Sequence, residues 1–150
     1  MKIVVGSDHG GFQFKEAIKK HLVEKGHEVF DVGTSSEARC NYPDYAILAG
    51  EKVASGEAKY GFIVCTTGIG ISIAANKVKG VRCAVGYDDE AVRLTRNDND
   101  ANMISFGQGF MKLEDVLRRV DIFLSTEAEG GRHANRVNLI KNYEDKHYCR

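Results

Sequence analysis

The sequence has no excess of charge of either sign. Lysine and arginine together number 21 of the 150 residues, and aspartate and glutamate also number 21. A chain without net positive charge has little long-range attraction for nucleic acid or for an anionic membrane surface. We therefore expect neither nucleic acid nor a membrane among the partners of this protein.

The sequence also lacks a long hydrophobic run. The apolar stretch in its N-terminal segment, MKIVVGSDHGG, is far too short for a signal peptide or a membrane span. Without such a signal we expect a cytoplasmic protein. A length of 150 residues and a hydrophobic content of 43% suit one globular domain with a real core, which we predict to cover residues 1–150.

Cysteine pairs are missing as well. The four cysteines form no CxxC motif and are spread along the chain: Cys40, Cys65, Cys83 and Cys149. This spacing argues against a zinc knuckle or structural disulfides and favours free thiols. Cys83 is typical of a cysteine buried in a strand, and nothing near Cys40 or Cys149 indicates a function. Cys65 is therefore the thiol of interest.

Short strand-like runs alternate with helical patterns along the chain. The strand-like runs cover residues 2–6, 28–32, 60–65, 82–87 and 102–107. The helical patterns cover residues 14–22, 43–53, 71–78, 89–96, 113–124 and 133–143. This alternation predicts an α/β fold, a doubly wound three-layer αβα sandwich around a five-stranded parallel sheet. The simplest strand order is 2-1-3-4-5.

Two loops of this predicted sheet carry most of the reactive residues. In open α/β sheets, ligands bind beyond the carboxyl ends of the strands, at the point where the strand order reverses. For the predicted order this point lies between the first and third strands. The loops that follow them read SDHGG at 7–11 and CTTGIG at 65–70. We therefore expect the functional site there.

The loop after the third strand places a thiol beside a helix start. Gly68 and Gly70 allow close backbone approach, and the first N–H groups of a helix can hold an oxyanion. The helix dipole favours the thiolate of Cys65. The alternatives are a tight strand–helix turn and a cysteine that only packs. The adjoining thiol and the position in the crevice favour a functional site.

The loop after the first strand brings a carboxylate and an imidazole to the same crevice. Asp8 and His9 are followed by Gly10 and Gly11, which leave space for a ligand. The alternative is an aspartate that caps the next helix beside a partly exposed histidine. We favour ligand binding.

Two further segments carry polar side chains in dense patterns. In EGGRHANRV (129–137), Arg132 and Arg136 are four residues apart on one helix face, and with His133 they suit phosphate recognition. The alternative is a solvated basic face. The run RNDNDANM (96–103) is either a helix stop or a row of acceptors directed at a ligand.

These motifs together resemble those of the RpiB/LacAB family of sugar-phosphate isomerases. The resemblance covers essentially the whole chain. It rests on SDHGGF near the start, NYPDYA at 41–46, CTTGIGISIAANK at 65–77, NDNDAN at 97–102 and EGGRHANRV near the end.

The resemblance implies the interconversion of an aldose phosphate and its ketose through an enediolate, without a metal, a nucleotide or another cofactor. It places the catalytic base at Cys65. The backbone N–H groups that would hold the oxyanion belong to Thr66, Thr67, Gly68, Ile69 and Gly70. Further substrate-binding positions are Asp8, His9, Asn99, Arg132 and Arg136.

The resemblance also implies a second copy of the chain as a partner. In the family the two arginines reach across from the other subunit of a dimer. We therefore expect a homodimer, or a tetramer of two such dimers, with the active site shared between subunits.

Three residues differ from the family pattern. Thr66 stands where glycine is common, Asp98 where a histidine opens the sugar ring, and Gly109 where an arginine binds phosphate. We interpret Asp98, with Thr67 or His133, as the group that opens a furanose ring.

The predicted function is the isomerisation of ribose 5-phosphate and ribulose 5-phosphate, with Cys65 as the base. The three differences leave other phosphorylated sugar substrates open, namely a tetrose 4-phosphate and allose or galactose 6-phosphate. Two rival classes are a non-catalytic module that binds a phosphorylated ligand and a thiol redox protein. The lack of a nearby resolving cysteine argues against the redox protein.

Overall fold

The computed structural model of this chain describes residues 1–148, so Cys149 lies outside the described residues. The elements follow in the order β1 (Lys2–Ser7), a 3₁₀ turn η1 (His9–Gly11), α1 (Phe12–Glu24), β2 (Glu28–Asp31), α2 (Tyr42–Ala54), β3 (Tyr60–Cys65), α3 (Ile69–Ala75), β4 (Cys83–Val85), α4 (Asp89–Asn97), β5 (Met103–Gly107), α5 (Leu113–Ser125) and α6 (Arg132–His147). The α/β architecture is confirmed. Every helix in this part of the chain is too short or too polar to cross a membrane.

The predicted strand order is wrong at one edge of the sheet. The five strands are parallel, in the order β2-β1-β3-β5-β4 rather than 2-1-3-4-5. All five residues of β5 are buried, whereas β4 has three residues that are only half-buried. The longer and more buried strand lies in the inner position beside β3, and the shorter strand covers the edge.

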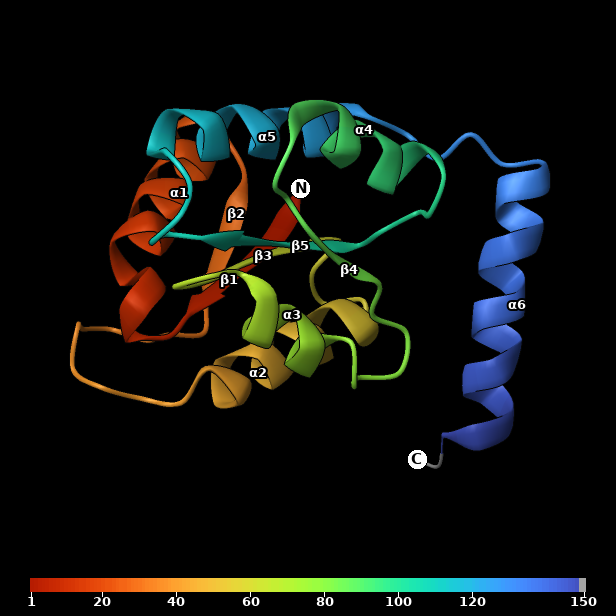
Figure 1. The fold of residues 1–150 in the computed structure, drawn as a ribbon, viewed down its shortest axis with the longest axis horizontal. Coiled ribbons are helices and arrows are strands. Elements are labelled where there is room, and N and C mark those ends of the chain that lie inside the picture. The colour runs from red at the N-terminus through yellow and green to blue at the C-terminus, as the bar shows by residue number, and fades with distance from the viewer. Residues whose placement is uncertain (149–150) are drawn as a thin grey trace.

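The exchange of β4 and β5 decides which helices share a face. Right-handed crossovers place a helix on one face when the chain moves along the sheet in one direction, and on the other face when it turns back. The step from β4 back to β5 is such a reversal. Accordingly α4 joins α1 and α5 on one face, whereas α2 and α3 cover the other (Figure 1).

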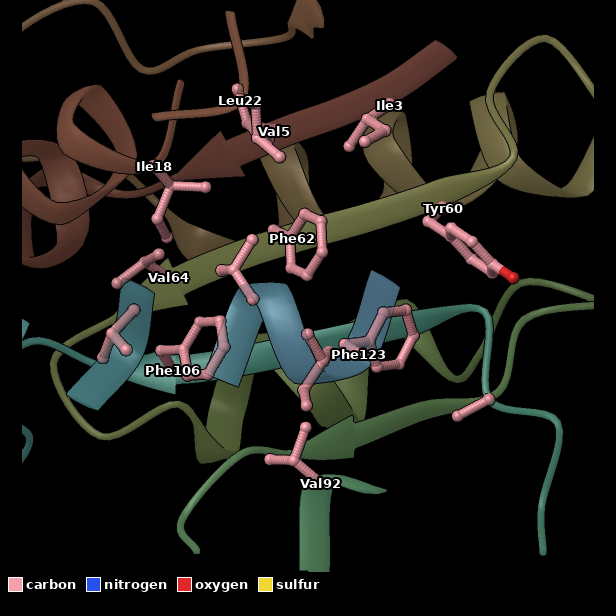
Figure 2. Packing of buried hydrophobic residues seen from close by; sticks show 14 residues of the cluster. Ile3, Val5, Ile18, Leu22, Tyr60, Phe62, Val64, Val92, Phe106 and Phe123 are labelled. Atoms are coloured by element: carbon pink, nitrogen blue, oxygen red, sulfur yellow. The ribbon is translucent and has the colours of Figure 1, made fainter. Parts of the chain in front are cut away.

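The core under α1, α4 and α5 is built on aromatic rings (Figure 2). Phe123 of α5 meets the rings of Tyr60 and Phe62 edge-on, with centroids 5.2 and 5.5 Å apart. Phe62 also stacks on Phe106, so β3, β5 and α5 are joined by one aromatic cluster. The core on the other face is made of smaller residues, including Ala46, Ala49 and Ala75, which let α2 and α3 pack closely.

α6 stands apart from the sheet, at the end that the strand arrows point away from (Figure 1). It contacts the body where Gly80 N–H donates to Glu144 Oε2 at 2.7 Å and where Lys79 pairs with Asp145. The helix ends at His147, four residues beyond the predicted end. Half or more of the surface of three apolar side chains on it is exposed: Leu139, Ile140 and Tyr143.

Candidate active site

Cys65 is the last residue of β3, at the centre of the predicted crevice. The thiol is buried, and Gly68 N–H donates to its sulfur at 3.2 Å. Ser105 Oγ donates a hydrogen bond to the carbonyl oxygen of Gly68 at 2.7 Å, and this bond holds in place the residue whose N–H reaches the sulfur. The loop holds Cys65 as a positioned thiol.

Glycine is required at position 68 by both conformation and space. Its φ is 78°, in the left-handed region, and a Cβ there would lie 2.9 Å from the carbonyl carbon of Phe106. The turn leads directly into α3, which starts at Ile69, two residues earlier than predicted. Thr67 Oγ1 accepts the N–H of Ile69 at 3.1 Å. The predicted loop geometry is thus present, and the Thr67 side chain stabilises the turn before α3 through this local hydrogen bond.

Asp8 lies beside this loop, as predicted. β1 pairs with β3, and Asp8 N–H donates to Val64 O at 3.3 Å. The side chain is only 6% exposed, yet its Oδ1 is buried with no hydrogen-bond partner among the described residues. A buried carboxylate oxygen without a donor is costly, so a donor from a bound molecule would stabilise it. Asp8 is a ready acceptor for a ligand hydroxyl.

His9 connects the crevice to a loop that is distant in the sequence. Its Nδ1 lies 3.2 Å from both the backbone nitrogen and the carbonyl oxygen of Cys40. The loop of residues 33–41 therefore forms one wall near Asp8. Cys40 has a positional role through its backbone, which nothing in the sequence indicated.

Two of the three differences from the family pattern meet at one point. A Cβ on Gly109 would lie 2.9 Å from the Thr66 methyl carbon Cγ2, and a Cβ on Gly10 would overlap Thr66 Oγ1. Gly109 N–H also donates to Thr66 O at 2.9 Å. The Thr66 side chain therefore occupies the space between two glycines. The glycine at 109 is what allows the larger residue at 66.

Tyr42 is a neighbour of the loop that sequence reasoning missed. It opens α2, and a Cβ on Gly70 would lie 2.8 Å from its ring. Its place in the NYPDYA motif, just before Pro43, was the available signal. By contrast, desolvation raises the pKa of the Cys83 thiol to about 12, which agrees with the packing role predicted for it.

The remaining predicted residues do not lie with Cys65 in one chain. Asp98 and Asn99 follow α4 and precede β5, at the edge where the strands begin. Cys65 pairs with Gly107, at the far end of β5 from Met103. The four steps between them span about 13 Å along the strand. A single chain therefore separates the predicted site into two groups.

The arginines belong to the second group. Arg132 and Arg136 are exposed on the first turns of α6, away from the strand ends that carry Cys65 (Figure 1). They are free to meet a phosphate brought by another molecule. The same helix carries His133, which is buried toward the body.

His133 is surrounded by carboxylates. Its Nε2 lies 3.5 Å from Asp98 Oδ1 and 3.6 Å from Glu129 Oε2. Asn97 Nδ2 donates to both carboxylates, at 2.7 and 3.0 Å. The ligand atoms of Asp98, Glu129 and His133 lie within 4.8 Å of one another, so these three could also hold a metal ion. Sequence reasoning missed Asn97 and Glu129, although Glu129 lies four residues before His133.

Comparison with known proteins finds relatives over almost the whole chain. The sequence model of the family described as Ribose/Galactose Isomerase matches residues 3–140. The chain is 45% identical over 145 residues to ribose-5-phosphate isomerase B of Escherichia coli, covering 97% of each. It is 42% identical over 147 residues to the putative sugar phosphate isomerase YwlF of Bacillus subtilis, covering 97% of this chain and 99% of the relative.

Solved structures agree with these relatives. Ribose-5-phosphate isomerase B of Clostridium thermocellum superposes with a TM-score of 0.95 at 45% identity, covering 97% of this chain and 99% of that one. The Mycoplasma genitalium ribose-5-phosphate isomerase B with bound ribulose-5-phosphate gives 0.93 at 36% identity and covers 97% of each chain.

Proposed function

We propose that this chain, which belongs to the ribose/galactose isomerase family, interconverts ribose 5-phosphate and ribulose 5-phosphate through an enediolate. The observation that carries the proposal is the buried Cys65 thiol. It accepts an N–H from a glycine loop at the end of β3, beside an Asp8 carboxylate oxygen that has no hydrogen-bond partner in the part of the chain that the structure describes. Relatives that are named for this activity, and a solved relative with bound ribulose-5-phosphate, support it.

Cys65 acts as the base in this mechanism. Its thiolate removes the proton from C2 of the open-chain aldose, and the electron pair moves through C1 onto the carbonyl oxygen. The N–H groups of residues 66–70 hold the resulting oxyanion, because a preformed cradle needs no reorganisation when charge develops. The hydroxyl proton on O2 then passes to O1, and the Cys65 thiol returns its proton to C1 as the C2 oxygen becomes a carbonyl, which completes the ketose and restores the thiolate. Thr67 keeps the cradle in shape through its bond to Ile69.

Substrate binding requires two chains. Asp8 and His9 contact the sugar beside Cys65, whereas Asn99, Arg132 and Arg136 reach the same sugar from a second copy. The separation of the two groups along β5 supports this arrangement, as does the exposed apolar surface of α6. We propose a homodimer with two shared sites, or a tetramer of two such dimers, working in the cytoplasm.

The test follows both pentose phosphates by NMR with purified protein, beside Cys65→Ala. Brisk turnover by the wild type and none by the variant supports the proposal. Turnover by the variant at the wild-type rate contradicts the role of Cys65. If the wild type ignores the pentoses but acts on a tetrose 4-phosphate or a hexose 6-phosphate, the chemistry stands and the ribose assignment falls. If the protein binds these sugars but converts none of them, the result favours a ligand-binding module.

A further inference from the structure

The His133 cluster has the arrangement of a proton-transfer site. We propose that His133 is the catalytic group that opens the furanose ring of the substrate, and that Asp98 and Glu129 position it. This inference rests on the proposed function, because the sugar must lie between this cluster and the Cys65 loop of the partner copy. It assigns to the imidazole a proton transfer that sequence reasoning gave to Asp98, with Thr67 or His133 beside it.

The carboxylates fix which ring nitrogen can react. Asp98 Oδ1 and Glu129 Oε2 lie 3.5 and 3.6 Å from Nε2, so this nitrogen carries the proton. Nδ1 has no hydrogen-bond partner among the described residues, so in the tautomer that places the proton on Nε2, facing the carboxylates, its lone pair is available as a base. A carboxylate behind one ring nitrogen holds the tautomer and stabilises the imidazolium that forms when the other accepts a proton. An imidazole also exchanges protons near neutral pH more readily than a carboxylate does.

The two carboxylates are themselves held in place. Asn97 Nδ2 donates to Asp98 Oδ1 at 2.7 Å and to Glu129 Oε2 at 3.0 Å. Glu129 N–H in turn donates to Asn97 O at 3.0 Å, which joins the segment before α6 to the end of α4. One amide therefore keeps both acidic groups near His133, although they come from separate segments. Carboxylates that gather on a surface by chance do not require a shared hydrogen-bond donor that holds them together.

The space beside the imidazole suits one edge of a sugar. A hollow of about 70 Å³ lies against His133, bounded also by Asn97, Asp98, Asn138 and Lys141. This volume admits a hydroxyl-bearing edge or one or two waters but not a whole ribose. The rest of the ring must then lie outside the hollow, which is where the Cys65 loop of a second copy would stand in the proposed dimer.

The phosphate-binding arginines orient the ring toward His133. Arg136 is three residues from His133, so the two side chains are neighbours on the surface of α6. In ribofuranose 5-phosphate the phosphate is carried on C5, the carbon outside the ring that is attached to C4, and C4 is bonded to the ring oxygen O4. A phosphate held by Arg136 therefore brings O4 and the adjoining C1 within reach of the imidazole.

The ring-opening step needs no reactant other than the sugar and the imidazole. Nδ1 takes the proton of the hydroxyl on C1 as the C1–O4 bond breaks and its electron pair moves to O4. C1 becomes the aldehyde carbon, and the imidazolium returns the proton to O4. The open-chain aldose is then the substrate for Cys65.

The experiment measures ribose 5-phosphate turnover against enzyme concentration for the wild type and His133→Asn. We expect the wild-type rate to rise in proportion to enzyme. The variant should reach a plateau at the uncatalysed rate of ring opening, about 100-fold below the wild type at high enzyme. Free imidazole, which catalyses ring opening in solution, should raise this plateau and leave the wild type unchanged. Asp98→Asn and Glu129→Gln should reach plateaus between the two.

The matched control is His147→Asn, the same substitution at the far end of the same helix, which should follow the wild type. A His133→Asn rate that stays proportional to enzyme overturns the inference, whether it equals the wild type or is uniformly lower. The uniformly lower rate would indicate a binding or structural role. A wild type with no turnover of either pentose phosphate instead overturns the proposed function itself.

Discussion

Two inactive variants should regain activity when they are mixed in one dimer, if the active site is shared between copies. Cys65→Ala removes the base, and a chain carrying both Arg132→Ala and Arg136→Ala lacks the phosphate grip. Cys65 pairs with Gly107 at the carboxyl end of β5, whereas the arginines lie on α6, beyond the edge where the strands begin (Figure 1). The two ends of β5 alone are about 13 Å apart, which is far beyond the 3 Å or so of a hydrogen bond. One chain therefore cannot supply both groups to one sugar.

The size of the effect follows from counting sites. In a mixed dimer, one site receives both defects and the other receives Cys65 from one chain and the arginines from its partner. Random pairing makes half of the dimers mixed, and each of these has one intact site of two. Activity should therefore return to about a quarter of the wild type.

The assay coexpresses the two variants with different affinity tags and measures ribose 5-phosphate isomerisation of the pooled protein. The matched control coexpresses Cys65→Ala with Asp8→Asn. Both of these changes fall in the same half of the site, so no pairing creates an intact one. If the first mixture is as inactive as the control, the shared site is refuted.

Three further predictions concern the loop, the buried ion pair and a second thiol. Gly68→Ala should lower the free energy of unfolding by about 1–3 kcal/mol, measured in urea, and abolish turnover, because φ is positive and the strand behind leaves no room. Gly56→Ala, also at positive φ but with open space around it, should keep full turnover. Burial alone would raise the pKa of Asp31, but bonds from Lys15, a second lysine and a backbone N–H hold it below its usual value. The stability this gives is complete above about pH 4 and lost as pH falls through the lower folded pKa, so unfolding of Asp31→Asn should depend less on acid pH. Because the pKa of Cys83 is about 12, iodoacetamide at neutral pH should leave it unmodified by mass spectrometry.

The half of the site around Cys65 could be predicted from the sequence because it depends on two neighbouring strands, β1 and β3. Buried runs at the start of the chain and at residues 60–65 fixed which loops meet at the reversal of strand order. The exchange of β4 and β5 did not disturb this, since both lie on the outer side of β3. Their order depends on which strand buries more surface, and the pattern of alternation carries no such information.

The half of the site around Asp98 could be predicted only in its residue types. Its position before β5 places it at the edge opposite Cys65, and the spacing of residues gives no hint of how a second copy would approach. The bridge made by Asn97 joins segments 32 residues apart, a contact that only the packed structure reveals. The space shared by Thr66 and Gly109 is of the same kind, because two separate departures explain each other only once they touch.

The most direct test of the central claim is proton exchange at C1 of ribulose 5-phosphate in D₂O, followed by NMR. Cys65→Ser is the informative variant, because a hydroxyl keeps the size and the acceptor for Gly68 N–H but is a much weaker base. The account predicts that the wild type introduces deuterium at C1 and that the variant does so at least about 100-fold more slowly. Exchange by Cys65→Ser at the wild-type rate would contradict it.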